Sequence, residues 1–323
     1  MDFDFNSYEK SIISFKEDID YSLILKNDCI CVGFTNCEIN IYFPQDFSPK
    51  INIKYITNQK QFPSNKIFLM EKESNQLLTL YNANVLYIRE IDYANYSYKD
   101  IKIIENFNYY YLRKSLKENY YYGIGENKIA YLRIYNEAIS VLRFNNYVEF
   151  FYEIPSKKYK EIVVKNVEND EIYFFERIKF KNIHKIDDIR LNARRSTPID
   201  TCPFIYYKKE NLLLVFWNLI NFIDMATHTI IYKYYDTSTS MRSILYAHKL
   251  VNEKYFVIQY TRACCGEDTE PKNINAPTFE MKEITKIDLL KTNIIFAKFS
   301  QSMKYLVLRN RENRNEIILF SKH

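Results

Sequence analysis

Glycine and tryptophan are scarce in this sequence, which has 4 Gly and 1 Trp among 323 residues. No phosphate-binding P-loop is present. The stretch Gly123-Ile124-Gly125 lacks the third glycine and the following helix of a dinucleotide-binding loop, so we interpret it as a hairpin turn. Asn and Asp tolerate positive φ better than other residues, and they are expected to replace glycine at the turns.

The features of secreted and membrane proteins are also missing. The longest apolar run, near Leu212–Ile223, is interrupted by Asn218 and Asn221 and does not approach membrane-spanning length. The N-terminal residues MDFDFNSYEK are acidic and polar and contain no apolar signal-peptide segment. These absences predict a soluble cytoplasmic protein with reduced thiols.

Recognisable catalytic and metal-binding motifs are absent. The six cysteines form no paired CxxC modules, and the four histidines show neither HxH nor HExxH spacing. Zinc sites depend on such spacings. No GxSxG motif occurs either. We therefore expect no enzymatic activity, no metal and no cofactor, although a site built from residues distant in sequence stays open.

The charge is modest, with a formal net value of +5. This falls short of the concentrated basic footprint of a dedicated nucleic-acid binder, so nucleic acid is not an expected partner. Two basic patches stand beside aromatic residues, at Lys157-Lys158-Tyr159-Lys160 and at Lys208-Lys209. Such patches can follow a nucleic-acid backbone. Acidic clusters are interspersed, and solvated loops are the simpler interpretation.

Alternating apolar residues on both sides of a polar turn are the main positive signal, and they are clearest in residues 30–43, ICVGFTNCEINIYF. Ile30, Val32 and Phe34 fall on one face of a first strand. Ile39 and Ile41 fall on one face of a second. This pattern predicts a β-hairpin.

Weaker versions of the hairpin recur from Ser11–Phe15 to Glu316–Phe320. Helical periodicity is confined to residues 109–118 and 184–193, each long enough for a helical turn. The sequence therefore predicts an all-β fold.

The hairpins recur with a period. Strands that match the second strand of a four-stranded unit centre near Val32, Leu78, Tyr122, Tyr173, Leu213, Phe256 and Tyr305. Their separations lie between 40 and 51 residues. Units of four strands near this period are typical of propellers, in which sheets bury their faces by radial packing.

The pattern resembles a seven-bladed, WD40-like β-propeller across nearly the whole chain, although no Gly-His or Trp-Asp dipeptide stands at the blade positions. The resemblance implies one domain, residues 1–323, of seven four-stranded blades. Ser11–Phe15 is expected to supply the outer strand of the last blade and to close the ring. A long β-sandwich or a two-domain β protein is the alternative.

Arg194-Arg195-Ser196-Thr197 lies between two expected units. Paired arginines can bind phosphate through bidentate hydrogen bonds. The placement resembles the phosphoinositide-binding propellers, whose motif is Phe/Leu-Arg-Arg-Gly, but Ala193 and Ser196 replace its first and last residues. The resemblance implies phosphate or lipid binding by Arg194 and Arg195 at an anionic membrane surface. A solvated arginine pair is the simpler interpretation.

A long segment, residues 262–282, has the position of the membrane loop of that family, but it is acidic and polar. Long loops on rigid scaffolds often carry binding. We interpret it as a candidate partner-binding loop, with contacts from Arg262, Cys264, Cys265, Glu267 and Asp268. Acids next to the paired cysteines would raise the pKa of the thiols, which disfavours a reactive thiolate.

The expected function is a non-catalytic protein-interaction scaffold, because propellers offer rigid faces with variable loops. A phosphoinositide-binding propeller that uses Arg194 and Arg195 is the alternative.

Overall fold

The hairpin predicted at residues 30–43 is present in the computed structural model as β3 (Ile30–Phe34) and β4 (Glu38–Tyr42). The N–H of Cys37 closes the turn by donating to Phe34 O at 2.9 Å, and Cys37 has a φ of 67°. All of β3 is buried. Both of its faces are therefore covered, and its side chains enter two different cores.

The structure describes residues 7–43, 46–54, 67–133, 138–145, 148–166, 171–187, 204–208, 211–216, 219–235, 242–249, 255–261, 275–276, 279–280, 294–310 and 313–322. These residues contain no helix that is long and apolar enough to cross a membrane.

Consecutive strands pair as antiparallel sheets of four. The first sheet contains β2 (Ile19–Ile24), β3, β4 and β5 (Pro49–Lys54). The second contains β6 (Ile67–Glu73), β7 (Gln76–Tyr81), β8 (Val85–Asp92) and β9 (Ser97–Ile104). The third contains β10 (Tyr111–Lys114), β11 (Tyr120–Ile124), β12 (Lys128–Arg133) and β13 (Ala138–Arg143).

The fourth sheet contains β14 (Val148–Glu153), β15 (Glu161–Asn166), β16 (Ile172–Glu176) and β17 (Asn182–Ile186). The fifth contains β18 (Phe204–Tyr207), β19 (Leu212–Phe216), β20 (Leu219–Asp224) and β21 (Thr229–Tyr235). Two pairs follow: β22 (Arg242–Lys249) with β23 (Tyr255–Thr261), and β24 (Asn275–Ala276) with β25 (Phe279–Glu280).

The last sheet joins distant parts of the sequence. It contains β26 (Ile294–Phe299), β27 (Tyr305–Asn310), β28 (Glu316–Lys322) and, as its outer strand, β1 (Tyr8–Ser14). β1 is antiparallel to β28, and Tyr8 is opposite Lys322. Arg309 on β27 donates to the carbonyl oxygens of Ile19 at 2.6 Å and Asp20 at 3.1 Å. The last sheet is thereby tied to the first.

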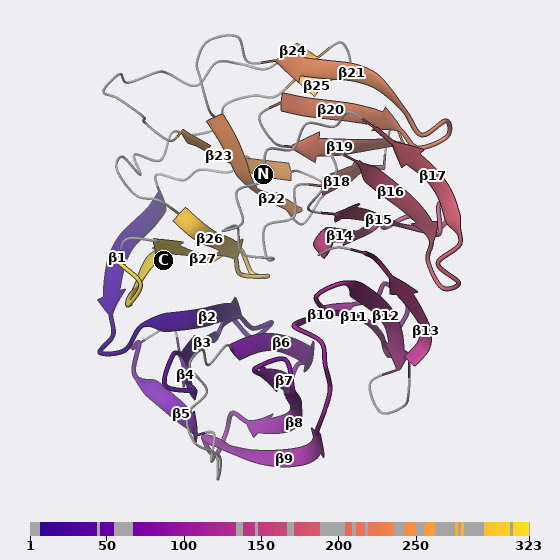
Figure 1. Cartoon of the computed structure of the whole chain (residues 1–323). Coiled ribbons are helices and arrows are strands. Elements are labelled where there is room, and N and C mark those ends of the chain that lie inside the picture. The colour runs from indigo at the N-terminus through magenta and orange to yellow at the C-terminus, as the bar shows by residue number, and fades with distance from the viewer. Residues whose placement is uncertain are drawn as a thin grey trace.

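The sheets surround a common centre (Figure 1). β2, β6, β10, β14 and β18 are the inner strands, and β5, β9, β13, β17 and β21 lie outside. Five buried clusters each combine residues of two neighbouring sheets, in the pairs last–first, first–second, second–third, third–fourth and fourth–fifth. The hydrophobic core therefore lies between the sheets.

Turn chemistry compensates for the scarcity of glycine. Six of the thirteen described non-glycine residues with positive φ are Asn or Asp, so the prediction that these residues replace glycine holds at those six positions, while other residue types occupy the remaining seven. Gly33 serves a different purpose. A Cβ at this position would lie 3.1 Å from Cγ2 of Ile67, so the first and second sheets approach closely here.

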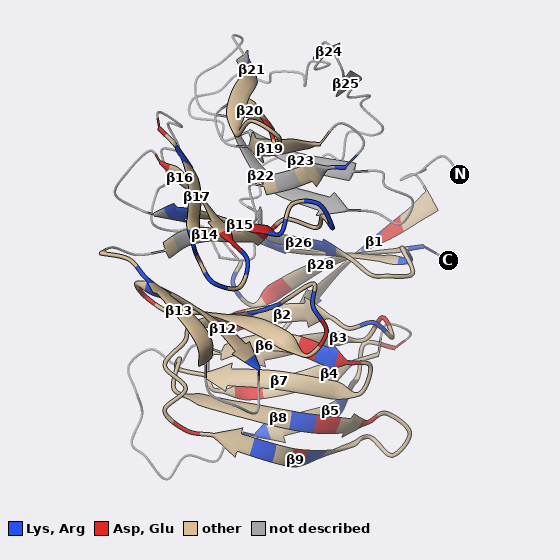
Figure 2. Ribbon diagram, turned by 90° about the vertical axis from the view of Figure 1, so that its right-hand side faces the viewer, with Lys and Arg blue, Asp and Glu red and all other residues tan. Residues whose placement is uncertain are grey.

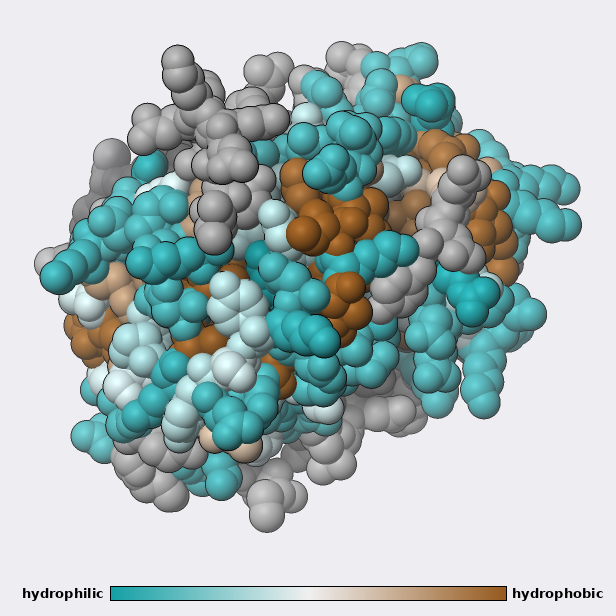
Figure 3. Space-filling view, turned by 90° about the horizontal axis from the view of Figure 1, so that it is seen from below, coloured by the Kyte–Doolittle hydropathy of each residue, from teal (hydrophilic) through white to brown (hydrophobic). Residues whose placement is uncertain are grey.

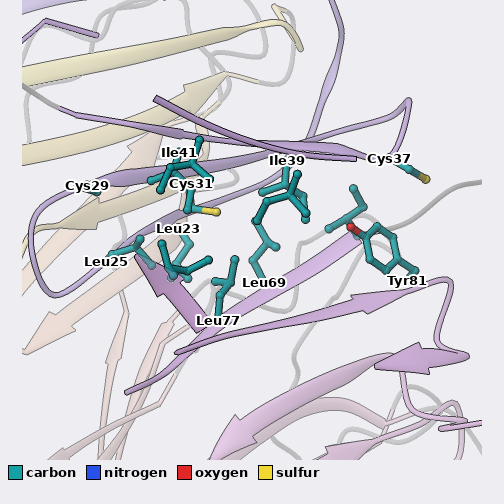
Figure 4. Packing of buried hydrophobic residues seen from close by; sticks show 14 residues of the cluster. Leu23, Leu25, Cys29, Cys31, Cys37, Ile39, Ile41, Leu69, Leu77 and Tyr81 are labelled. Atoms are coloured by element: carbon teal, nitrogen blue, oxygen red, sulfur yellow. The ribbon is translucent and has the colours of Figure 1, made fainter. Parts of the chain in front are cut away.

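The cluster between the first and second sheets includes Cys29, Cys31 and Cys37 (Figure 4), all three buried as free thiols. Burial, with Asp28 and Glu71 nearby, raises the pKa of Cys29 to about 11. Burial also raises the pKa of Cys31 and of Cys37. These thiols are therefore packing groups, since the reactive form is the thiolate.

Alkylation tests whether these three thiols are protected in the folded chain. At pH 8, we expect iodoacetamide to leave Cys29, Cys31 and Cys37 unmodified in the folded chain and to modify all three after denaturation in urea. The raised pKa values keep the thiols protonated, and burial blocks access. Peptide mapping by mass spectrometry measures each site. Equal labelling rates in the folded and the denatured chain would contradict the assignment.

The outer strands depart from the simple apolar alternation. In β9 every residue up to Ile103 is exposed, including Ile101 and Ile103 themselves. From the side on which β5 and β9 lie, hydrophilic residues separate the hydrophobic surface into patches (Figure 3). Lys99 and Lys102 on β9 are charged edge residues of the kind that discourage strand-to-strand association.

Two predictions of helical turns were wrong where the structure can be compared with them. Residues 109–118 contain β10, which pairs with β11, and residues 182–186 form β17, which pairs with β16. Pairing with an adjacent strand of the same sheet stabilises both segments as strands. The segment expected to be one long loop, 262–282, contains the short β24–β25 pair.

Candidate functional site: the lysine face

One end of each of the first five sheets carries two kinds of turn. The strands are antiparallel and consecutive, so the turn after the first strand and the turn after the third lie at the same end. In Figure 2 the turn from β8 to β9 marks this end at the right-hand edge. We call it the turn side. Contacts there join neighbouring sheets from the first to the fifth: Lys26–Glu71, Lys114–Lys72, Leu116–Glu153 and His228–Glu161.

A largely buried ion pair lies within the fourth sheet at the turn side, and hydrogen bonds from the third sheet reach its carboxylate. Glu153, the last residue of β14, lies 2.8 Å from Nε of Arg177, and their side chains are 6% and 14% exposed. Glu153 also accepts hydrogen bonds from Leu116 N–H at 2.7 Å, from Ser115 Oγ at 3.1 Å and from Tyr122 OH at 3.3 Å. The carboxylate thus organises two neighbouring turns.

Burial raises the pKa of Glu153, although the Leu116 N–H and the Arg177 charge act in the opposite direction. Arg177 extends the network through two hydrogen bonds. Its side-chain Nη2 donates to Ile154 O at 2.9 Å, and its backbone N–H donates to Lys160 O at 2.8 Å. The turn after β16 is therefore fixed to the turn after β14. This pair positions the surface around it.

The fourth and fifth sheets are joined in a similar way. Nε2 of His228 lies 2.8 Å from Oε2 of Glu161 at the start of β15. The His228 ring contacts Phe174 and His184, with centroids 4.8 Å and 5.5 Å away. Two histidines that are distant in sequence thus meet. Even so, no group of three or more metal-ligating side chains occurs among the described residues.

The turn after β14 presents lysines from a fixed backbone. Ile154 and Tyr159 are buried and anchor its two ends. Oγ of Ser156 accepts the N–H groups of Lys158 and Tyr159, both at 3.2 Å. Lys157, Lys158 and Lys160 are exposed between and beside these anchors. The local structure therefore directs positive charge outward.

The turn after β16 follows the same plan. Glu176 accepts the Lys179 N–H at 2.6 Å, and Phe180 is buried at a φ of 53°. Lys179 and Lys181 on either side of Phe180 are exposed. In this turn too, a buried aromatic ring fixes the backbone and the neighbouring lysines project from it.

Two further turns complete this surface. In the turn after β10, Ser115 is buried, and its Oγ accepts the N–H of Lys117, which is exposed. In the turn after β18, Lys208 is exposed, and Asn211 accepts a hydrogen bond from Tyr206 OH at 3.0 Å. These turns belong to the sheets on either side of the fourth.

We define the lysine face as the exposed lysines of these turns: Lys117, Lys157, Lys158, Lys160, Lys179, Lys181 and Lys208. None of them forms an ion pair with another residue in the described parts of the chain. Glu118 is the one carboxylate among the described residues of these turns. The surface therefore carries seven lysines against this one carboxylate, and none of the seven forms an ion pair with a described residue.

Neighbouring carboxylates on the strands are already engaged. Glu153 and Glu161 hold Arg177 and His228. Asp224 accepts Ala226 N–H at 3.1 Å and Thr227 Oγ1 at 2.8 Å, and these turn hydrogen bonds lower its pKa. The acids at this end thus support the turns.

The opposite end of the sheets has a different charge. Its described connections expose Glu17, Asp18, Glu105, Glu126 and Asp187. The exposed cations there include Lys16, Arg143 and Arg314. Lys and Arg are blue and Asp and Glu are red in Figure 2. The described turns are thus basic at one end and mainly acidic at the other.

The residues predicted as sites from the sequence lie outside the described residues. This holds for Arg194 and Arg195 and for the loop residues Arg262, Cys264, Cys265, Glu267 and Asp268. By contrast, Lys157, Lys158 and Lys160 are brought to the same end as Lys208. Sequence reasoning missed Glu153 and Arg177, whose only signal is a charged residue at the end of an apolar strand.

Comparison with known proteins gives the fold its name. No protein-family profile matches the chain, and no curated protein is similar to it in sequence. A structure titled "Crystal structure of WD40 beta propeller domain of Doa1" has a TM-score of 0.62 at 12% identity, covering 97% of this chain and 96% of that chain. A chain from "Crystal Structure of Mitotic Checkpoint Complex" has a TM-score of 0.62 at 9% identity, covering 96% and 90%. Together with the repeated four-stranded sheets, these likenesses confirm the WD40-like β-propeller fold predicted from the sequence.

Proposed function

We propose that this protein is a non-catalytic, cytoplasmic protein-interaction scaffold, built as one propeller domain of seven blades. On this proposal β22 and β23 belong to the remaining blade, and the pairing of β1 with β28 closes the ring. The observation that carries the proposal is the lysine face, a set of unneutralised charges held on turns with buried anchors. Rigid propeller faces with variable turns are suited to binding proteins.

The titles of the two similar structures agree with this proposal in one respect. One of those chains was solved as part of a multiprotein complex, the mitotic checkpoint complex. At such low identity the likeness shows the fold alone and does not identify the partner of this chain. Residues 262–282 remain a second candidate contact. Phosphoinositide binding through Arg194 and Arg195 is the alternative function.

Affinity purification of the tagged chain from its native cell, followed by mass spectrometry, tests the scaffold. We expect a protein partner in stoichiometric amount. Chemical cross-links from that partner should fall on one end of the propeller. A second purification with residues 262–282 deleted tests the loop separately. Recovery of the bait alone, from both native and cross-linked cells, would contradict the scaffold function.

A further inference from the structure

We propose that the lysine face binds an acidic, extended segment of a partner protein. This inference rests on the scaffold function and specifies its binding surface and the chemistry of its partner. The segment would be rich in Asp and Glu and would lie across the turns of the third, fourth and fifth sheets.

Electrostatics favours an anionic partner for the lysine face. Exposed like charges held close together repel one another, and a bound anion relieves this repulsion. On the lysine face no described carboxylate forms an ion pair with the lysines. The charges also span several sheets, which suits a long flexible anion better than a small one.

The lysine face is fixed before binding. Buried Ile154, Tyr159 and Phe180 anchor the turns. Hydrogen bonds from Leu116 N–H and Tyr122 OH to Glu153 join the third sheet to the fourth, and the pair Glu161–His228 joins the fourth to the fifth. A fixed binding surface loses little conformational entropy when a partner binds, which favours affinity.

Nucleic acid is a poorer match for the lysine face. Proteins that bind single-stranded nucleic acids combine a basic groove with aromatic rings on which bases stack. Tyr120 already stacks on Tyr131 at 5.1 Å, with Nζ of Lys117 4.2 Å from its ring centroid. Tyr159 is buried, and Nζ of Lys158 lies 5.0 Å from its ring centroid. These rings are engaged within the protein.

Phosphate and lipid are also poorer matches for the lysine face. Bidentate recognition of phosphate depends on the guanidinium fork of arginine. In these turns the described arginine, Arg177, is directed inward to Glu153 and Ile154 O. Leu116, 56% exposed, is the one large apolar side chain among the exposed residues described in these turns. A surface that inserts into a membrane would need more exposed apolar side chains.

Fluorescence anisotropy with a labelled polyglutamate peptide tests the proposal on the full-length chain. We expect binding that weakens as salt rises. The variant Lys157→Glu/Lys179→Glu/Lys208→Glu should bind about tenfold more weakly, because each reversed surface charge removes a modest interaction. The matched control Lys16→Glu/Arg143→Glu/Arg314→Glu makes the same charge change at the opposite end. It should stay within about twofold of the unmodified chain.

A second variant tests whether the loss of binding results from misfolding. Lys157→Gln/Lys179→Gln/Lys208→Gln removes the charges without reversing them, and it should give an intermediate loss with an unchanged melting temperature. Equal weakening by the two triple Glu variants would overturn the location of the site.

The same chains are then mixed with a polythymidine oligonucleotide and with vesicles containing phosphatidylserine. Stronger binding of either probe than of polyglutamate, lost in the lysine variant, would overturn the partner class. Vesicle binding lost only in Arg194→Ala/Arg195→Ala would support the alternative function instead.

The purified partner separates this inference from the scaffold function. If a stoichiometric partner binds the lysine variant as well as it binds the unmodified chain, the lysine face is not the binding surface, and the scaffold function still stands. If its binding falls about tenfold with that of polyglutamate, both are supported.

Discussion

Replacement of Glu153 by alanine is expected to lower the free energy of unfolding by about 3 kcal/mol, because it removes one partner of a buried ion pair. The loss leaves Arg177, Leu116 N–H and Tyr122 OH without the carboxylate that they share. These groups lie between two sheets, so the contact between the third and fourth sheets weakens as well. Urea denaturation followed by circular dichroism measures the change.

Glu153→Gln is the matched control. It keeps an oxygen that can accept the Leu116 N–H but removes the charge that pairs with Arg177, so its cost should be smaller than that of alanine without being zero. The double variant Glu153→Ala/Arg177→Ala should cost less than the sum of the single variants, since the two residues interact directly. Strict additivity, or an alanine variant as stable as the unmodified chain, would contradict the role given to the pair.

The pKa of Glu153 adds a dependence on pH. Because burial raises this pKa in the folded chain, protonation of Glu153 favours folding. That contribution is fully present below the ordinary glutamate range and is lost as pH rises through the raised value. Relative to Glu153→Gln, the unmodified chain should therefore lose stability between acidic and neutral pH.

Removal of residues 1–14 is expected to destabilise the chain by about 4 kcal/mol, at roughly 0.5 kcal/mol for each ladder hydrogen bond. This deletion removes β1, whose residues pair with β28 from Tyr8–Lys322 to Ser14–Glu316. It also removes Ile13, which packs between the last and first sheets. Thermal unfolding and light scattering measure the result, because a bare β28 edge also promotes association.

A synthetic peptide of residues 7–14 provides the test of mechanism. Added in excess, it should raise the melting temperature of the shortened chain by restoring the outer strand. As a control for side-chain effects, Ile12→Thr should change stability by less than about 0.5 kcal/mol, since Ile12 is 57% exposed. A shortened chain with an unchanged urea midpoint would show that β1 adds little.

The middle strands of the sheets were predictable because their apolar residues form buried hairpins. β3 and β4 are the clearest case, and both faces of β3 enter cores. β9 was not predicted, because its side chains are exposed and mostly polar. Its strand structure comes from pairing with β8, a contact that local sequence does not encode.

The candidate site was predictable only in pieces. The charges of Lys157-Lys158-Tyr159-Lys160 and of Lys208 are visible in the sequence, where they read as two separate solvated loops. Their convergence follows from topology, since both follow the first strand of a sheet. The pair Glu153–Arg177 could not be predicted, because it bridges the turns after β14 and β16 across the sheet.

The pairing of β1 with β28 has a consequence for how the chain can be engineered. Tyr8 is opposite Lys322, so these residues stand where a two-residue turn would join the strands of an ordinary hairpin. A short linker between them would make the backbone continuous around the last sheet. New ends could then be opened at another exposed turn, such as the one between β8 and β9. The fold depends on which strands are neighbours, and the position of the chain break is a separate choice.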